Sequence, residues 1–436
     1  MSRTVLDIFL SSTSEDLREY RTAVAGALER MQEATLRMES WGARPTAPLP
    51  TCRAEVGRCD ALIVVVAHRY GWIAPEADGG DGIRSITWWE VEWALQADKP
   101  VFAFVIDPAY PWSGPREQDA LVSAATESEG LAVWRRVRSL QDFRAFLDRR
   151  TTRAYFTSPD QLGGLVVTSL LDLVLAHRVE QATKAVKDAP LPAPPPAQAP
   201  APAIASTPPP RAAFQFTVEG DQAVVVGSDV VVFAKGISTT QRSDIVNALL
   251  LAQLAKKTVP APTSLDDVQK WYDDYVEVLS NIGFTFDEST FERVTGGPTG
   301  IDLQKVVVDV AAVTLEPAAL ALVGKTLQSL RNLPPDSPTR SLFAVSVTKT
   351  AAHFQVVLVE SDGSDGLRLR TLAFGLQTAN AVQEILFFKA TKSVTQLIKR
   401  SAAVTVNTTV LSAVREQIAQ KLANRVDDKV AGLDVD

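Results

Sequence analysis

A proline-rich segment near the middle of the chain constrains its folding more than any other feature. Residues 186–212 hold ten of the 26 prolines, separated mostly by alanine. Because proline lacks a backbone N–H and fixes φ, the segment is predicted to be an extended polyproline spacer. A docking site for a proline-binding partner is the alternative, but a basic flank at the right spacing is missing. We therefore expect an N-terminal domain at 1–185, a linker at 186–212 and a C-terminal domain at 213–436.

Composition and charge narrow the class of protein. The chain has 436 residues and a net charge of −7, which argues against a protein that binds nucleic-acid phosphates. The apolar runs are too short to span a bilayer, and the N-terminal run at 5–10 is too short for a signal peptide. Cys52 and Cys59 are the only cysteines and are expected to be buried or inert thiols. We expect a cytoplasmic protein with no membrane span and no nucleic-acid partner.

The N-terminal domain has the pattern of a parallel α/β fold. Strands are predicted at 5–11, 34–39, 61–67 and 101–107, and helices after Ser12 and at 51–58, 87–97, 135–150 and 158–184. The spacing of Ser12 and Glu15 is that of a capping box at the start of the first helix. Strands with no polar face that alternate with helices predict a flavodoxin-like parallel sheet covered on both sides.

The C-terminal domain has a different pattern. Apolar segments at 223–234 and 354–376 are predicted to be hairpins, the second turned at Ser364–Gly366. Further strands are expected at 384–390 and 402–406, and helices at 240–257, 264–282, 301–313, 317–331 and 408–425. This order predicts an α+β domain with mostly antiparallel strands.

Three segments in order resemble the Toll/interleukin-1 receptor (TIR) superfamily, specifically the TIR-like domains that often precede NACHT-type ATPases. The segments are DIFLSSTSEDLREYR at 7–21, CDALIVVVAHRYGW at 59–72 and SITWWEVEWALQADKPVFAFVID at 85–107. In TIR domains that cleave NAD, the catalytic residue is a glutamate in the third helix. Glu90 occupies that place, five residues before Leu95 and shortly before Lys99-Pro100. The resemblance covers about residues 3–110 and implies a catalytic role for Glu90.

The sequence departs from the TIR pattern in one respect. A tryptophan usually lies four residues before the glutamate, whereas Ile86 is at that position here. Glu92 also competes for the role, although it projects roughly 200° around the helix from Glu90. The same helix and strand resemble nucleoside deoxyribosyltransferases, which also attack an N-glycosidic bond.

The chemistry of that bond explains why a carboxylate would lie here. Cleavage passes through an oxocarbenium-like state, which a carboxylate stabilises, and the leaving nicotinamide is already cationic. Tyr70 and Trp72 are candidates to stack on a flat base, and Trp89 is a further substrate-binding candidate. Ser11 and Ser12 could contact ribose or phosphate oxygens at the following helix N-terminus.

Structural roles compete with each of these assignments. An acidic residue in the first turn of a helix is favourable for dipole reasons alone. Tryptophans at 88, 89 and 93 are typical of packing anchors. The three histidines are isolated, so no metal site and no cofactor are expected, with NAD a possible substrate.

Two functions from different classes follow. The first is a TIR-like effector that cleaves NAD or a related nucleotide, an NAD glycohydrolase, with a C-terminal domain that senses or self-associates, in a setting of bacterial defence. The second is a non-enzymatic scaffold whose TIR-like domain makes only protein contacts. The C-terminal sequence does not indicate its ligand.

Overall fold

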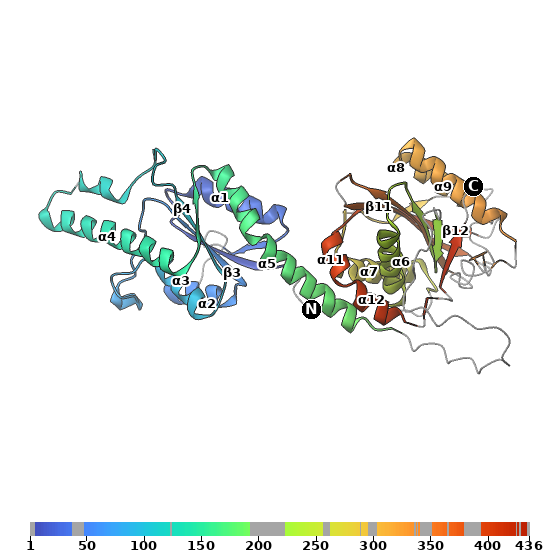
Figure 1. Cartoon of the computed structure of the whole chain (residues 1–436), viewed down its shortest axis with the longest axis horizontal. Coiled ribbons are helices and arrows are strands. Elements are labelled where there is room, and N and C mark those ends of the chain that lie inside the picture. The colour runs from blue at the N-terminus through green and yellow to red at the C-terminus, as the bar shows by residue number, and fades with distance from the viewer. Residues whose placement is uncertain are drawn as a thin grey trace. The chain divides into compact units, whose positions relative to one another are not determined.

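The chain forms two compact units, Met1–His177 and Arg178–Asp436, each built on a sheet of its own (Figure 1). The computed structural model describes residues 5–36, 48–122, 124–191, 223–255, 262–287, 289–294, 303–334, 337, 339–340, 351–363, 366–378, 394–423, 425–426 and 429–433. The division between the units falls inside a helix, ahead of most of the proline-rich segment. The central part of that segment, 192–212, lies outside the described residues.

The N-terminal unit contains a five-stranded parallel sheet in the order β2-β1-β3-β4-β5. Its strands are β1 (Asp7–Ser12), β2 (Ala34–Leu36), β3 (Ala61–Val66), β4 (Val101–Ile106) and β5 (Arg153–Phe156). Its helices are α1 (Arg18–Arg30), α2 (Pro48–Arg58), α3 (Ile86–Gln96), α4 (Glu127–Arg150) and α5 (Pro159–Asp188), with short 3-10 turns η2 (Glu76–Asp78) and η3 (Glu117–Leu121). The parallel sheet confirms the predicted fold class.

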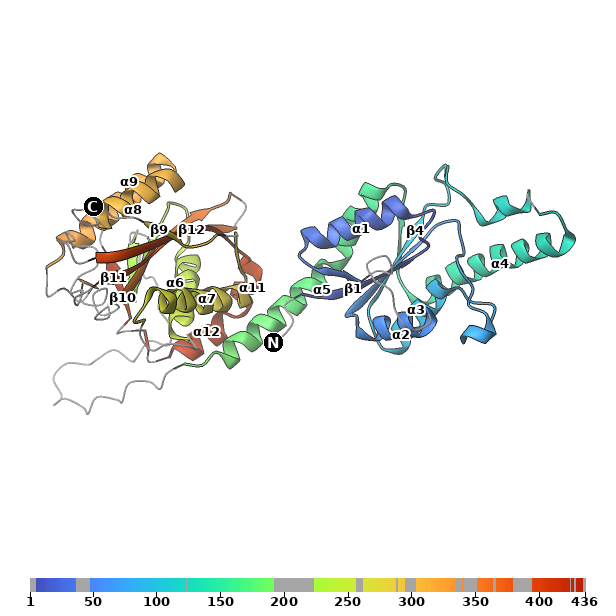
Figure 2. The same ribbon diagram turned by 180° about the vertical axis from the view of Figure 1, so that it is seen from behind.

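Burial on both faces explains why the strands have no polar side. All six residues of β3 are buried, as expected for a central parallel strand. Helices α1 and α5 cover one face of the sheet, and helices α2, α3 and α4 cover the other (Figure 2). The carboxyl ends of these parallel strands lie at the same end of the sheet. The loops that follow them are where parallel folds bind their ligands.

Two local predictions in this unit need correction. The capping box at Ser12 and Glu15 is absent, because β1 runs through Ser12 and α1 begins only at Arg18, with Leu17 as an N-cap that makes no side-chain bond. Strand β5 was not predicted, because RAYF is short and only partly buried at the sheet edge. The predicted strand at 34–39 is present as Ala34–Leu36, and residues 37–39 lie outside the described part of the chain.

The C-terminal unit has a larger, mostly antiparallel sheet. Its strand order is β13-β6-β7-β10-β11-β12-β8, and β9 also pairs with β12. The strands are β6 (Ala223–Val226), β7 (Asp229–Phe233), β8 (Phe284–Phe286), β9 (Glu292–Val294), β10 (Ala351–Ser361), β11 (Leu367–Thr378), β12 (Val394–Val406) and β13 (Val430–Leu433). Among the described pairs, β7 with β10 is parallel and the others are antiparallel. This confirms the predicted α+β class.

Helices cover both faces of the second sheet (Figure 1). Side chains of α6 (Thr239–Leu254), α7 (Leu265–Asn281), α11 (Thr408–Ala413) and α12 (Arg415–Leu422) pack on one face, and side chains of α8 (Leu303–Thr314) and α9 (Pro317–Asn332) on the other. Alternation along β7 explains the arrangement, because Val231 and Phe233 face the first group while Val230 and Val232 face the second. Buried on both faces, β7 has no polar stripe.

Both predicted hairpins are present. Strands β6 and β7 are joined at Gly227, whose positive φ of 54° suits a tight turn. Strands β10 and β11 pair along their length, although turn residues 364 and 365 lie outside the described residues, as does the predicted strand at 384–390. The single helix predicted at 408–425 is instead two, α11 and α12, which meet at Val414.

Helix α5 belongs to the cores of both units. Leu162, Val166 and Leu170 are fully buried in the N-terminal core, while Ala182 and Val186 are buried in the C-terminal core. Helix α5 has 30 residues and contains an 18-residue window with a mean hydropathy of 1.5, so it is long and apolar enough to cross a membrane by length and composition. Of that window, 28% is buried inside the protein.

Candidate functional site

A cavity of about 680 Å³ lies at the carboxyl ends of β1 and β3. The loop after β1, the loop after β3 and the first turn of α3 supply its walls. Its lining residues are Ser12, Thr13, Ser14, Glu15, Asp16, Arg21, Pro48, Arg69, Gly71, Trp72, Ile86 and Thr87. Two of the six residues singled out from the sequence, Ser12 and Trp72, therefore line one cavity. Its volume is within the usual range for small-molecule sites.

Glu90 lies one turn of α3 below the cavity wall. Its side chain is buried, with only 3% of the residue exposed, and Glu90 does not line the cavity. The hydroxyl of Ser11 donates a 2.5 Å hydrogen bond to Glu90 Oε2. The structure thus brings together two residues that were chosen separately from β1 and α3. A buried carboxylate held by a hydroxyl has a fixed orientation.

Cys52 of α2 adjoins the same carboxylate. Burial raises the pKa of its thiol well above the ordinary value, and the neighbouring Glu90 raises it further. The thiol is therefore protonated and unreactive at neutral pH, as expected for a buried cysteine. Ser11, Cys52 and Glu90 form a polar cluster beneath the cavity, inside an otherwise apolar layer.

Ser12 has a different role from Ser11. Its hydroxyl accepts a 2.6 Å hydrogen bond from Arg21 Nη1 and donates to the carbonyl of Thr13. Since α1 begins at Arg18, Ser12 does not cap that helix. The contact instead holds the Arg21 guanidinium at the cavity wall.

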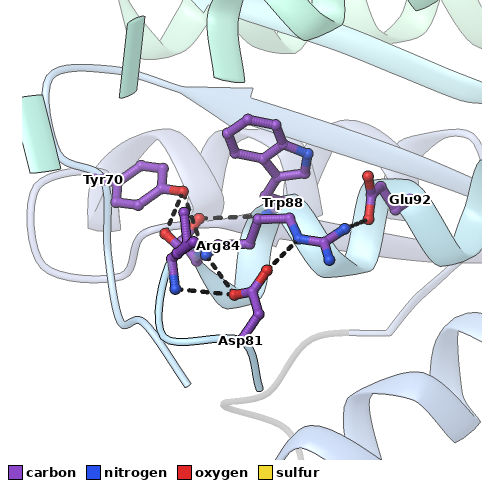
Figure 3. Close-up of polar contacts among 7 residues, drawn as sticks. Tyr70, Asp81, Arg84, Trp88 and Glu92 are labelled. Atoms are coloured by element: carbon purple, nitrogen blue, oxygen red, sulfur yellow. Dashed lines mark hydrogen bonds and ion pairs between the residues drawn. The ribbon is translucent and has the colours of Figure 1, made fainter. Parts of the chain in front are cut away.

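Tyr70 supports the loop that precedes α3. Only 2% of the residue is exposed, and its hydroxyl donates to the carbonyl of Ile83 and accepts from the N–H of Ser85 (Figure 3). Burial raises the pKa of this hydroxyl, so it stays protonated. Tyr70 is therefore not placed to stack on a ligand. Its bonds fix Ser85, the N-cap of α3, whose hydroxyl accepts from Trp88 N.

Arg84 contacts both Glu92 and Trp89. Its guanidinium donates to Asp81 Oδ2 at 2.6 Å and to Glu92, bridging the loop and the helix (Figure 3). The same group lies 3.6 Å from the centre of the Trp89 ring, which also stacks on Trp93. Glu92 is thus paired with an arginine, and Trp89 packs against Arg84 and Trp93 and does not line the cavity. This leaves Glu90 as the carboxylate of α3 next to the cavity.

Charges of both signs line the cavity. Trp72 is 45% exposed and offers a flat apolar surface beside Arg69. Arg69 lies 3.5 Å from Glu15 and 3.6 Å from the buried carboxylate of Glu117. Burial raises the pKa of Asp16, although Thr13 and Arg69 act in the opposite direction. Two arginines and an exposed indole can contact anionic groups and a flat ring.

Among the described residues, no set of side chains is arranged to bind a metal ion. No group of three histidine, cysteine, aspartate or glutamate side chains able to hold a metal ion occurs in the described part of the chain. His68 follows β3, and burial together with Arg144 and Arg116 lowers its pKa to about 4, so the ring is neutral.

Sequence reasoning missed Arg21, Arg69 and Cys52. Arg69 follows the carboxyl end of β3, so the rule that selected Tyr70 could have selected it as well. Arg21 lies on α1, and a single arginine on a helix has no sequence pattern that marks it as part of a cavity. Cys52 could not be found, because its contact with Glu90 depends on how α2 packs on α3.

Comparison with known proteins shows a match to one family over this unit. The family model described as a domain of unknown function, DUF4062, matches residues 7–171. Curated proteins gave no match.

Several solved structures show weak likeness. The TIR domains of the activated Roq1 resistosome, which recognises the pathogen effector XopQ, share 14% identity at a TM-score of 0.25, covering 38% of this chain and 99% of that one. The activated Cyt2Ba monomer of Bacillus thuringiensis subsp. israelensis shares 12% sequence identity at a TM-score of 0.26, and the match covers 40% of this chain and 95% of that one. The Evf virulence factor shares 13% sequence identity at a TM-score of 0.25, and the match covers 49% of this chain and 88% of that one. Likeness at this level carries no functional argument.

Proposed function

We propose that the N-terminal unit binds NAD or a related nucleotide in the cavity above α3 and cleaves its N-glycosidic bond. The observation that carries the proposal is the Ser11–Glu90 hydrogen bond one turn below the cavity. The bond holds the carboxylate of Glu90 near the carboxyl ends of the strands, and this supports the proposal because parallel folds bind their ligands there. Arg21 and Arg69 would contact the phosphates and Trp72 would stack on a base.

Glu90 would act on the sugar carbon. As the bond between ribose C1′ and the nicotinamide nitrogen breaks, its electron pair leaves with the nitrogen, and positive charge develops on the ribose. A carboxylate nearby stabilises this charge, and water then adds to C1′ and loses a proton. Nicotinamide leaves as a neutral molecule, so the reaction needs no strong general acid.

Burial of Glu90 implies an opening step. With 3% of the residue exposed, the carboxylate reaches no substrate until the side chains above it move. In the proposed cycle, nucleotide binding or association between copies of the chain uncovers it, and Ser11 exchanges its bond with Glu90 for one to the ribose. The C-terminal unit would sense a signal or drive that association. The resemblance to TIR-like domains suggests a role in bacterial defence.

A matched pair of variants tests the catalytic assignment. Purified chain is incubated with NAD, alone and with a crowding agent that promotes association, and nicotinamide release is measured. Glu90→Gln should reduce turnover by at least about 100-fold. Glu92→Gln is the control, since Glu92 is paired with Arg84 away from the cavity lining. Equal losses from both variants would contradict the assignment.

The same burial of Glu90 favours a second function. A carboxylate held by Ser11 beneath a closed wall also suits a structural polar cluster in a domain that makes only protein contacts. If no nucleotide is cleaved under either condition while the chain self-associates, the scaffold function replaces the enzymatic one.

A further inference from the structure

The first turns of α4 carry two large apolar side chains that are exposed to solvent. Leu131 is 52% exposed and Trp134 is 58% exposed, whereas Leu140, further along the same helix, is buried in the core. This part of α4 extends beyond the sheet of the N-terminal unit (Figures 1 and 2). Residues three positions apart are neighbours on a helix surface, so the two side chains form one patch. Exposed apolar patches of this kind mark interaction surfaces.

The other side of the same turns is anchored to the N-terminal unit. Val133 is buried, and Arg136 Nε lies 2.8 Å from Oε1 of Glu117, a buried residue of η3. These contacts hold one side of the helix to the core, so the side that carries Leu131 and Trp134 points away from it. The apolar patch is therefore presented to solvent on a helix that the core holds in place.

Charged residues continue the exposed face in both directions. One turn before the patch lies Glu127, and one turn after it lies Arg138, both exposed. We call these four residues the α4 stripe: Glu127, Leu131, Trp134 and Arg138. Successive members are four, three and four positions apart, which is the spacing of the contact seam between two packed helices. The stripe thus has an acidic end, an apolar centre and a basic end, and its ends lie about 16 Å apart.

The α4 stripe is complementary to a second copy of itself that runs in the opposite direction. Leu131 and Trp134 are centred on one point of the helix axis, and the two charged residues are centred on the same point. A two-fold axis through that point places Leu131 of each copy against Trp134 of the other. The same axis places Glu127 of each copy against Arg138 of the other. A parallel pair would instead set like charges against each other, which is unfavourable.

We propose that two copies of the chain form a two-fold symmetric dimer through the α4 stripe. The second copy is the occupant of this face because the charged ends of the stripe match each other when two copies run antiparallel. A contact between two helices over about three turns is smaller than a standard protein interface, so the dimer is weak and depends on concentration. The proposal is independent of NAD cleavage, and its test measures association rather than activity.

Sedimentation of the full chain over a range of concentrations tests the dimer. We expect a monomer–dimer equilibrium with a dissociation constant on the order of 1–100 µM. Glu127→Arg or Arg138→Glu alone should weaken it about tenfold or more, because each variant sets two pairs of like charges against each other. Trp134→Ala should weaken it as well, because it removes the aromatic anchor. A wild-type chain that stays monomeric up to about 0.5 mM would overturn the proposal.

Mixing the two charge variants tests the antiparallel arrangement. One copy with Glu127→Arg and one with Arg138→Glu bring opposite charges together at both ends, so the equimolar mixture should associate at least as tightly as wild type. The controls, Ser128→Arg and Arg150→Glu, change the charge at exposed positions of α4 outside the stripe and should leave association unchanged. Because every changed side chain is exposed, the unfolding temperatures should stay close to that of wild type. Association that both charge reversals leave unchanged, or that the mixture does not restore, would overturn the proposal.

Discussion

The hydroxyl of Tyr275 on α7 donates a 3.0 Å hydrogen bond to the fully buried carboxyl of Asp229 at the start of β7. Gln355 of β10 donates to the same hydroxyl and accepts from Tyr272. A carboxyl is thus set in the core of the C-terminal unit with hydroxyl and amide neighbours. Burial raises its pKa to about 7, although these hydrogen bonds act in the opposite direction.

Stability of the C-terminal unit should therefore depend on Asp229 between about pH 4 and pH 7. A carboxyl whose pKa is higher in the folded state than the ordinary 3.8 favours folding while it is protonated. That contribution is complete below about pH 4 and is lost as the pH rises through 7. Asp229→Asn should remove this loss and raise the unfolding temperature of the unit at pH 8 relative to wild type.

Calorimetry at pH 4, 6 and 8 measures this effect. The free-energy difference between wild type and Asp229→Asn should grow with pH, by on the order of 1.4 kcal/mol for each pH unit that separates the folded and unfolded pKa values. Asp273→Asn, at an exposed position on α7, is the control and should leave the pH profile unchanged. A constant difference at all three pH values would show that Asp229 titrates normally.

Ser11→Ala should destabilise the N-terminal unit by about 1–3 kcal/mol, because it removes the hydroxyl that donates to the buried carboxylate of Glu90. Ser14→Ala, at an exposed position on the cavity wall, should change the free energy of unfolding by less than about 0.5 kcal/mol. Urea unfolding of both variants gives the comparison. Equal stability of the two would mean that Glu90 finds another donor.

Arg84→Lys should loosen the loop before α3. A lysine cannot donate to Asp81 and Glu92 in the two directions that the guanidinium spans, nor lie flat on Trp89. We expect faster amide hydrogen exchange in residues 76–88 and little change in α1. Arg53→Lys, beside the Trp93 ring at 5.9 Å, makes a fair control. Exchange that rises equally in both variants would assign no special role to Arg84.

Proteolysis should first cut the proline-rich segment, which composition predicts to be an extended spacer. Because Ala182, Val186 and Ala189 are buried in the C-terminal core, the two fragments should remain associated after the cut. Denaturing electrophoresis should show two bands, and size-exclusion chromatography should show one peak. Two separate peaks would mean that residues 178–191 do not hold the fragments together.

Much of the fold was accessible from the sequence because its signals are local. The apolar strand predicted at 61–67 and the helix predicted at 264–282 each depend on neighbouring residues, and both are present as β3 and α7. The start of α1 was misplaced because Ser12 and Glu15 have the right spacing but lie in the strand and the turn after it. Local spacing cannot show where a strand ends.

The site was predicted less completely, for a physical reason. Ser11 and Glu90 were both chosen, yet their bond and the burial of Glu90 depend on the packing of α3 against β1. Tyr70 was chosen for its ring, but its hydroxyl is used by Ile83 and Ser85, partners set by a long loop. Side chains that meet across 79 residues of sequence leave no periodic signal.

The position of helix α5 bears on where the chain tolerates insertions. Because residues 178–191 and the sheet that begins at Ala223 belong to one compact unit, residues 192–222 connect two parts of the same core. The entropy of closing such a loop grows only with the logarithm of its length, so doubling the length costs roughly 0.6 kcal/mol. We therefore expect insertions between residues 192 and 222 to leave both cores intact.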